Sequence, residues 1–318
     1  MTASASEADS GVFAEGLLRG QGSRESEPLG SPLDVIGLAG LMERGDGRTK
    51  IAVGLLDGPV AMDHPDLVGA NVREVSGGIG SCSESGSAAC THGTFVAGIL
   101  CAKRDSAAPA ICPGSTLLVR PIFKETASSD ERMPSATPRE LAAAIVESVD
   151  GGARVLNVSA AFDQPSTRGE RLLGEALDHA ARRGVIVVAA AGNQGTLGSS
   201  AITRHPWVIP VVGCDLHGRP MGQSNLGSSV GRRGLMAPGE GVTSLGAEGK
   251  PLALGGTSVA APFVTGTITL LWSEFPDASA AEVKSAVTGV GYARRRTTVV
   301  PPLLDAWAAY EAMAKVRS

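Results

Sequence analysis

The sequence predicts an α/β fold in which helices flank a mostly parallel central sheet. Between residues 51 and 213, wholly apolar segments of strand length alternate with longer segments of helical period. Such alternation implies parallel strands joined by right-handed crossovers. Glycine is abundant, at 42 residues, and aromatic residues make up only 3% of the chain. This composition favours tight turns and close packing of helices on the sheet.

The expected strands are short apolar segments. The first, residues 51–56, is followed by Asp57, and a later one, residues 185–191, leads to Asn193. Continuous apolar segments of this length are typical of central strands covered on both faces. Further strands are expected at 116–122, 155–159 and 207–213, and turns with short strands at 230–255. Helices are expected at 36–41, 91–100, 140–149, 169–183, 280–287 and 303–316, and from Ser258 onward.

The chain of 318 residues, 43% of them hydrophobic, is long enough for one large core with tails. We expect a flexible N-terminal segment at 1–35, a folded domain at 36–290 and a C-terminal tail with a surface helix at 291–318. The net charge of −4 gives no reason to expect a nucleic-acid partner. No segment of 18 apolar residues is present, so we expect no membrane contact.

Cysteine usage and the N-terminus indicate a reducing compartment. The first residues lack a basic start followed by an apolar core, so we expect no signal peptide and a cytoplasmic location. The cysteines are then expected to be free thiols. The pair most readily oxidised in air is Cys82 and Cys90, which share a loop rich in Gly and Ser. The five cysteines are Cys82, Cys90, Cys101, Cys112 and Cys214.

Four polar residues stand at the ends of predicted elements. Asp57 and Asn193 follow apolar strands, where parallel sheets place their ligands, and His92 and Ser258 open helices. By itself, Asp57 could simply begin a turn, and Ser258 could simply cap its helix. Together they supply what nucleophilic acyl transfer needs: a hydroxyl, a base, a carboxylate that orients the base, and a donor for the oxyanion. We expect the helix dipole to lower the pKa of His92 and keep its ring neutral.

The motifs around these residues resemble those of the subtilase family. Residues 92–98, His-Gly-Thr-Phe-Val-Ala-Gly, look like its histidine motif, and 255–262, Gly-Gly-Thr-Ser-Val-Ala-Ala-Pro, like its serine motif. Ala190-Ala191-Gly192-Asn193 resembles its oxyanion segment, and the resemblance covers about residues 36–290. It implies a three-layer subtilisin-like catalytic domain. Asp57, His92 and Ser258 would form the triad, Asn193 the oxyanion hole, and Ser159, Ala160 and Ala161 the strand that pairs with substrate.

One departure from the family pattern narrows the resemblance. Asp57 is followed by Gly58-Pro59, where subtilases usually carry Thr-Gly or Ser-Gly. This variant, with His64-Pro65 after it, looks like the leader-cleaving PatA-like proteases of peptide natural-product pathways. The implied partner is a peptide or protein substrate, such as a ribosomally made precursor. The resemblance also implies that cyclising relatives carry a helical insertion between the aspartate and the histidine, which shields the acyl-enzyme from water. Only 34 residues (92 − 57 − 1) separate Asp57 from His92, so we expect no such insertion here, and hydrolysis rather than cyclisation.

Other interpretations are open at this point. A catalytically silent fold that only binds peptides would require a missing triad position, and none is missing. Cys90, His92 and Cys101 could form a metal site, and Gly77-Gly78-Ile79-Gly80 a nucleotide loop, but no supporting motif frames either one. The loop at 124–138 is expected to flank the substrate. We expect no cofactor; structural calcium is common among subtilases, yet no ligand pattern here resolves a site.

Overall fold

The computed structural model describes residues 30–75, 81–125, 136–159, 167–289 and 297–317. Its centre is a sheet of seven strands in the order β2-β3-β1-β4-β5-β6-β7, and every neighbouring pair is parallel. The predicted α/β class and parallel sheet are therefore confirmed. The strands are β1 (Ala52–Leu56), β2 (Val72–Glu74), β3 (Thr116–Val119), β4 (Val155–Val158), β5 (Ile186–Ala190), β6 (Val208–Cys214) and β7 (Leu235–Pro238).

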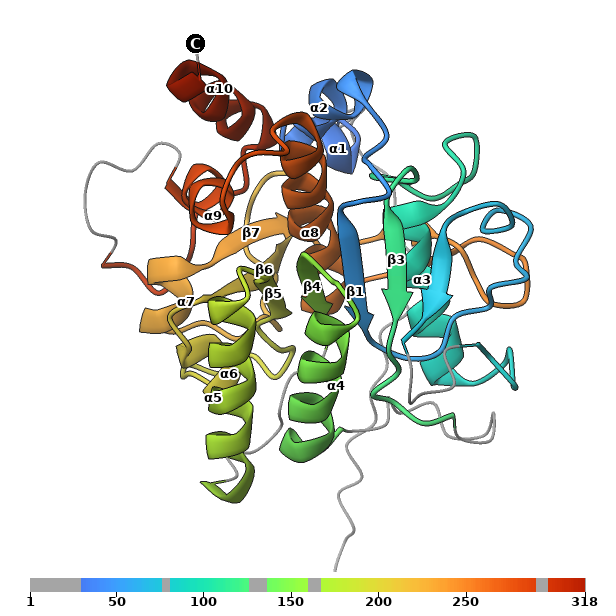
Figure 1. Ribbon diagram of the computed structural model, residues 1–318, viewed down its shortest axis with the longest axis horizontal. Helices are drawn as coiled ribbons and strands as arrows, with labels where there is room; N and C mark the ends of the chain where they lie inside the picture. The colour runs from blue at the N-terminus through green and yellow to red at the C-terminus, as the bar shows by residue number, and fades with distance from the viewer. Residues whose placement is uncertain (1–29, 76–80, 126–135, 160–166, 290–296, 318) are drawn as a thin grey trace, which may run out of the picture.

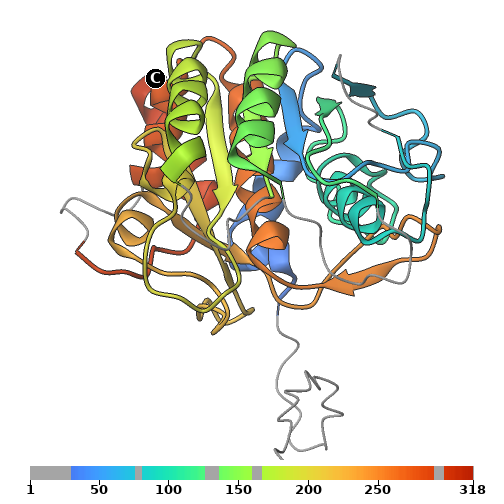
Figure 2. The same ribbon diagram turned by 90° about the horizontal axis from the view of Figure 1, so that it is seen from below.

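Helices cover both faces of this sheet and make three layers (Figure 1). On one face, α4 (Pro138–Asp150) and α5 (Thr167–Arg182) pack side by side, and both contribute to a core with Leu156 and Val187 of the sheet. On the opposite face lie α3 (Ala88–Cys101) and α8 (Thr257–Glu274), as the view from below shows (Figure 2). Their core includes Phe95, Phe263 and Trp272.

Helix α8 is the structural axis of the second face. It contacts five strands of the sheet and also α2 (Leu38–Arg44), α3 and α9 (Ala280–Gly289). Contact on every side explains why its sequence is apolar all round rather than amphipathic, and why residues as far along as Trp272 are buried. A serine at the start of this helix is therefore held by an element that is packed on every side.

Both ends of the described chain pack onto the domain. Residues 32–35, which we expected in a flexible segment, form α1 (Pro32–Val35), capped by Ser31. In the expected C-terminal tail, α10 (Ala306–Arg317) buries Ala306, Ala309 and Met313 and contacts α2 and α9. The Ala306 amide donates to the carbonyl of Ile36 at 2.8 Å. The segment before α10 also pairs with β7, since the Met236 amide donates to the Pro302 carbonyl at 2.6 Å.

Several short elements were not predicted from the sequence. The edge strand β2 is not among the expected strands, and α6 (Ala201–Arg204) and α7 (Ser228–Arg233) are single turns or little more. Residues 242–254 form a two-stranded antiparallel sheet from β8 (Val242–Ser244) and β9 (Leu252–Leu254), within the region expected to hold short strands. None of the described helices has the length and apolar character needed to cross a membrane.

Candidate active site

The structure brings Asp57, His92 and Ser258 into one hydrogen-bonded row at the carboxyl-terminal edge of the sheet. Nδ1 of His92 lies 2.7 Å from Oδ1 of Asp57, and Nε2 lies 2.9 Å from Oγ of Ser258. Both ring nitrogens are thus engaged, one by a carboxylate and the other by a hydroxyl. Because a carboxylate can only accept, the neutral ring carries its proton on Nδ1 and offers Nε2 as the acceptor for the Ser258 hydroxyl.

Asp57 is completely buried at the end of β1, and the tight packing around it accounts for the unusual Gly58. Oδ1 of Asp57 also accepts from the Gly58 amide at 2.6 Å. A β-carbon on residue 58 would collide with the carbonyl oxygen of Ala89 in the first turn of α3. The Thr or Ser that subtilases usually carry at this position therefore cannot fit here, because the first turn of α3 lies too close to residue 58.

The electrostatic setting of His92 differs from the one expected from the sequence. His92 is the fifth residue of α3, not its first, so it lies beyond the turn where the helix dipole acts most strongly. Burial of the ring lowers the pKa of His92, but the charge of Asp57 and its hydrogen bond to the ring raise it. The net result is a pKa above the ordinary histidine value. The expected lowering was wrong, since the buried carboxylate outweighs both desolvation and the helix terminus.

Ser258 is the second residue of α8 and does not cap it. The N-cap is Gly256, whose φ of 141° lies in a region that favours glycine, and no side chain caps the helix. The Ser258 hydroxyl is therefore available to His92. Pro262 lies inside the same helix. Having no N–H, Pro262 cannot donate to the carbonyl of Ser258 four residues earlier.

Asn193 lies beside the serine turn, and its amide is oriented by a backbone contact. The Thr257 amide donates to Oδ1 of Asn193 at 2.9 Å. The side-chain nitrogen is then on the other side of the amide group, with donors to spare. A second contact joins the same two segments, because the Gly192 amide donates to Oγ1 of Thr257 at 3.1 Å. Thr257 was not singled out from the sequence, yet its backbone amide and its hydroxyl hold the loop of Asn193 against the start of α8.

Ser159 lies directly after β4, at the same edge of the sheet, with its amide donating to the Leu56 carbonyl at 3.1 Å. A buried polar chain supports it. Oγ1 of Thr265 on α8 donates to Oδ1 of Asn157 at 2.9 Å, and Nδ2 of Asn157 donates to Oγ of Ser159 at 3.2 Å. In the sequence, the signal for these hydrogen bonds was an Asn within an apolar strand. The predicted partners Ala160 and Ala161, most of the 124–138 loop and the 77–80 glycines lie outside the described residues.

The structure corrects two expectations about cysteine. Cys82 and Cys90 form a disulfide, with their Cα atoms 5.6 Å apart, so not all five thiols are free. Cys101, Cys112 and Cys214 are free and buried. The interpretation of Cys90, His92 and Cys101 as a metal site is also wrong, because Cys90 is bonded to Cys82 and both nitrogens of His92 have partners. Both corrections depend on which side chains lie close together in the folded protein, and this could not be read from the sequence.

Comparison with known proteins agrees with this geometry. The subtilase family model matches residues 48–289. Subtilisin DY of Bacillus licheniformis is 29% identical over 83% of this chain and 91% of its own length. Fervidolysin of Fervidobacterium pennivorans is 31% identical over 82% of this chain, which spans only 40% of that longer protein.

Solved structures give the same result. The protease domain of PatA matches with a TM-score of 0.74 and 29% identity, over 85% of this chain and 98% of that one. The prenylagaramide maturation protease PagA matches with a TM-score of 0.74 and 28% identity, over 86% and 98%. The class of protein is therefore a subtilisin-like serine peptidase. The chain belongs to the subtilase family, and its resemblance to PatA-type proteases, first indicated by the Asp57-Gly58 motif, is confirmed.

Proposed function

We propose that this protein hydrolyses peptide bonds through an acyl-enzyme, with Ser258 as nucleophile, His92 as general base and Asp57 as the carboxylate that orients and stabilises the base. The single observation that carries the proposal is the engagement of both His92 nitrogens, 2.7 Å from Asp57 and 2.9 Å from Ser258. These separations are within the reach that proton transfer requires.

In the first half of the reaction, Oγ of Ser258 attacks the carbonyl carbon of the scissile bond while its proton passes to Nε2 of His92. The imidazolium then gives this proton to the departing amine, and the acyl group remains on Ser258. Asp57 stabilises the imidazolium through its hydrogen bond to Nδ1, which is the same interaction that raises the pKa of His92. Asp57 itself stays ionised throughout.

The negative oxygen of the tetrahedral intermediate would be bound by Nδ2 of Asn193 and the backbone amide of Ser258. The first amides of a helix have no intrahelical partner, so the Ser258 N–H is available for this role. Asn193 is held in place beforehand by Thr257, and such preset donors stabilise charge without reorganising during the reaction. Ser159 would pair with the substrate backbone beside this site, supported from below by Asn157 and Thr265.

Water is the proposed acceptor in the second half of the reaction, so the product is a linear peptide. Between Asp57 and His92, the described residues form the short strand β2, turns and the start of α3. No separate helix stands over the site within that part of the chain. An acyl-enzyme without such a cover is open to water, which competes with a peptide amine.

The proposed substrate is the leader region of a ribosomally made precursor peptide. Two observations support this narrower proposal. The Asp57-Gly58-Pro59 segment resembles that of the leader-cleaving proteases, and the similar structures include the prenylagaramide maturation protease PagA.

The experiment is to incubate the protein with a peptide library and with candidate precursor peptides, and to weigh the products. Linear fragments that have gained one water support hydrolysis, and a dominant product lighter by that water would contradict it. The second candidate function is a silent fold that only binds peptides. It is favoured if peptides bind while neither cleavage nor reaction of Ser258 with a fluorophosphonate occurs.

A further inference from the structure

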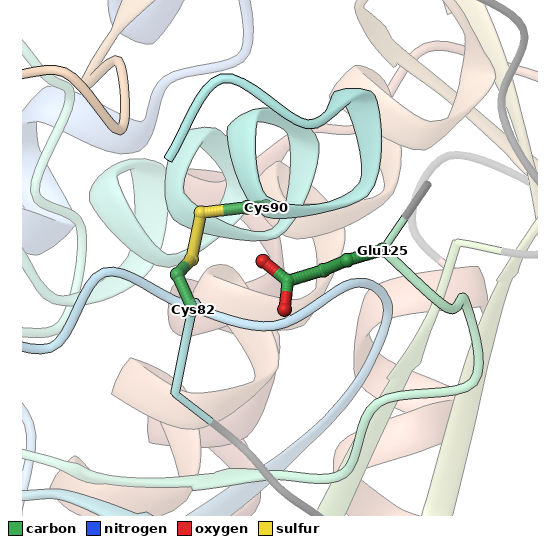
Figure 3. A group of neighbouring side chains, drawn as sticks. All are labelled: Cys82, Cys90 and Glu125. Carbon is green, nitrogen blue, oxygen red and sulfur yellow. A yellow bond between two sulfur atoms is a disulfide. The ribbon is translucent and has the colours of Figure 1, made fainter. Parts of the chain in front are cut away.

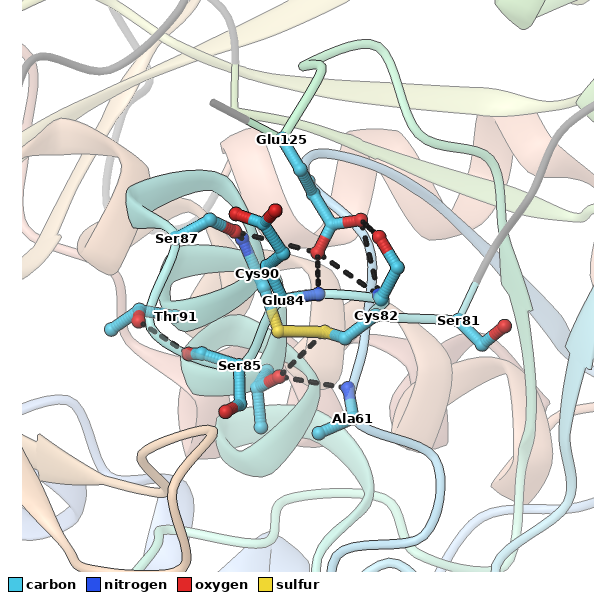
Figure 4. Close-up of a disulfide and its surroundings, with 12 residues drawn as sticks. Ala61, Ser81, Cys82, Glu84, Ser85, Ser87, Cys90, Thr91 and Glu125 are labelled. Atoms are coloured by element: carbon cyan, nitrogen blue, oxygen red, sulfur yellow. Dashed lines mark hydrogen bonds between the residues drawn. A yellow bond between two sulfur atoms is a disulfide. The ribbon is translucent and has the colours of Figure 1, made fainter. Parts of the chain in front are cut away.

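The loop from residue 81 to residue 87, here called the clamp loop, is fixed at several points (Figure 4). The Cys82–Cys90 disulfide joins it to the first turn of α3, two residues before His92. The Cys82 amide donates to the carbonyl of Val60 at 3.2 Å, just past the Asp57 turn. These contacts tie one loop to the elements that carry two of the triad residues.

Glu125 holds the same loop from the other side. Its carboxylate accepts from the amides of Ser83 and Glu84, at 3.1 and 2.8 Å, and from the hydroxyls of Ser83 and Ser87. Partial burial raises the pKa of Glu125, but these hydrogen bonds outweigh it and the pKa lies below its usual range. The carboxylate also faces the disulfide, within 4.8 Å of both sulfur atoms (Figure 3).

The clamp loop and Glu125 form part of the wall of a cavity of about 490 Å³. Other lining residues connect this cavity with the triad. The amides of Ile122 and Phe123 donate to the backbone carbonyl of Asp57 at 2.7 and 3.3 Å, and Pro59 follows Asp57 by two positions. Displacement of the wall would thus change the space beside the triad without touching Ser258.

We propose that the Cys82–Cys90 disulfide and Glu125 form a redox-sensitive clamp that holds one wall of the peptide-binding cleft, so that reduction of the disulfide weakens peptide binding. Cys82 and Cys90 are positioning residues in this inference, as is Glu125, and none of them reacts with the substrate. The inference rests on the proposed function only in taking the cavity as part of the cleft. Nothing in the triad mechanism requires a disulfide or Glu125 at this place.

The chemical step is thiol–disulfide exchange with a dithiol reductant. One thiolate of the reductant attacks the sulfur of Cys82, which is partly exposed, whereas Cys90 is buried. Cys90 leaves as a thiolate in the first turn of α3, where the helix dipole favours negative charge. The second thiol of the reductant then closes its own disulfide and releases Cys82. Two electrons pass to the protein, both cysteines end as thiols after protonation, and the dithiol is oxidised.

Without the disulfide, only hydrogen bonds hold the clamp loop, and those on the side of the cavity come from Glu125. Its hydrogen bonds bind backbone amides of an exposed loop, and each such bond contributes little net stability when water can replace it. The loop then samples several conformations, and a peptide binds only the conformation that the disulfide held in the oxidised protein. Ordering a loop on binding reduces affinity, so the expected effect is on binding rather than on the chemical step.

The decisive experiment measures peptide binding in the Ser258→Ala protein, so that it does not depend on turnover. A fluorescent peptide chosen from a library is titrated against the oxidised protein and against protein reduced with dithiothreitol, with EDTA present so that freed thiols cannot recruit metal with Glu125. We expect reduction to raise the dissociation constant about fivefold or more, a coupling of ordinary size. The Cys82→Ala/Cys90→Ala protein should bind weakly in both conditions, and Cys214→Ala should respond like its parent.

A second measurement uses the protein with Ser258 intact. The rate of its reaction with a small fluorophosphonate should be nearly the same in both redox states, while the KM for peptide rises and kcat changes little. Glu125→Ala should raise KM in the same way, and Glu125→Gln, which keeps acceptor oxygen, should be milder.

The possible results are distinct. An unchanged dissociation constant, with reduction of Cys82 and Cys90 verified by mass, overturns the clamp. A response to dithiothreitol that persists in the Cys82→Ala/Cys90→Ala protein overturns it as well. A parallel loss of fluorophosphonate reactivity would mean that the disulfide supports the triad itself, contrary to the inference. If Ser258 is unreactive in both states, the proposed function fails, while the binding experiment still decides the clamp.

Discussion

Oγ of Ser258 lies 2.9 Å from Nε2 of His92, although 166 positions separate the two residues in the chain. The contact exists because α3 and α8, which carry them, pack against each other on one face of the sheet. Neither side chain lies on a loop, so their relative position is set by core packing. This rigidity is what an activated nucleophile requires.

Ser258→Ala should abolish peptidase activity and leave the fold intact, because the change removes one oxygen at the start of a buried helix. Loss of the nucleophile in such a triad costs about 10⁶ in kcat. Turnover of a cleaved peptide and thermal unfolding measure the two effects. Ser273→Ala is the matched control: the same change on the same helix, where Oγ only donates to the Thr269 carbonyl at 2.8 Å. Retention of more than a few per cent of activity in Ser258→Ala would exclude it as nucleophile.

Asn193→Ala should lower kcat about 10²- to 10³-fold with little change in KM, because the donated hydrogen bond matters mainly in the transition state. Asn193→Asp separates two roles of the side chain. It keeps an oxygen for the Thr257 amide but has no donor for the oxyanion, so it should be at least as defective. Steady-state kinetics on one peptide measure both variants. A defect confined to KM would indicate ground-state binding instead.

The pH dependence of kcat/KM should reflect the raised pKa of His92. Protonated His92 cannot take the serine proton, so activity is low below this pKa and rises as the pH passes through it. The midpoint should lie above the ordinary histidine value. Asp57→Asn removes the charge that raises the pKa, so the midpoint should move to lower pH while kcat falls about 10⁴-fold. A midpoint that stays in place would mean that Asp57 does not set the titration.

Thr265→Val should destabilise the protein by about 1–3 kcal/mol, because it leaves Oδ1 of buried Asn157 without its donor. Thr265→Val keeps the side-chain volume but not the hydroxyl, and Thr265→Ser, the control, loses the methyl group but keeps the hydroxyl that donates to Asn157. Denaturant unfolding of both variants gives the difference. If Ser159 depends on this chain, the valine variant should also raise KM for peptides, whereas reaction with a fluorophosphonate should be little affected. Equal stability of the two variants would contradict the role assigned to the hydroxyl.

Thiol counting in denaturant without reductant should give three thiols, and five after reduction, because only Cys82 and Cys90 are paired. In the native protein the three free thiols should react slowly. Burial and the neighbouring Asp215 raise the pKa of Cys214 to about 12, and a hydrogen bond with Cys112, together with burial, raises that of Cys101 well above its usual range. A count of five in freshly purified protein would show that the disulfide does not form there.

The alternation of apolar strands and amphipathic helices was sufficient to predict the sheet and its main helices. Strands such as β5 are apolar throughout because both faces are covered, and that pattern is visible in the chain itself. Edge strand β2 was missed because its three residues are mostly exposed and carry no such pattern. Helix α10 was predicted as a surface helix, but its packing against α2 depends on a contact between distant segments.

The candidate catalytic residues could be named in advance because their motifs combine small residues with one reactive side chain. Their assembly agrees with that prediction, while their catalytic roles stay predictions. Other parts of the site depended on geometry. The pKa of His92 is set by Asp57, which is 35 positions away in the sequence. Glu125 binds Glu84 of the clamp loop, which precedes it by 41 positions. Neither relation leaves a local pattern in the sequence.

Helices α1, α2 and α10 gather near the C-terminal end of α8, opposite the end at which this helix begins (Figure 1). Because α10 is anchored there through Ala306 and Ile36, whatever is joined after it begins on the far side of the molecule from the candidate active site. The enzyme could therefore be immobilised on a surface or fused to a carrier through this end without obstructing the approach of a long substrate. The catalytic face would remain turned toward solution.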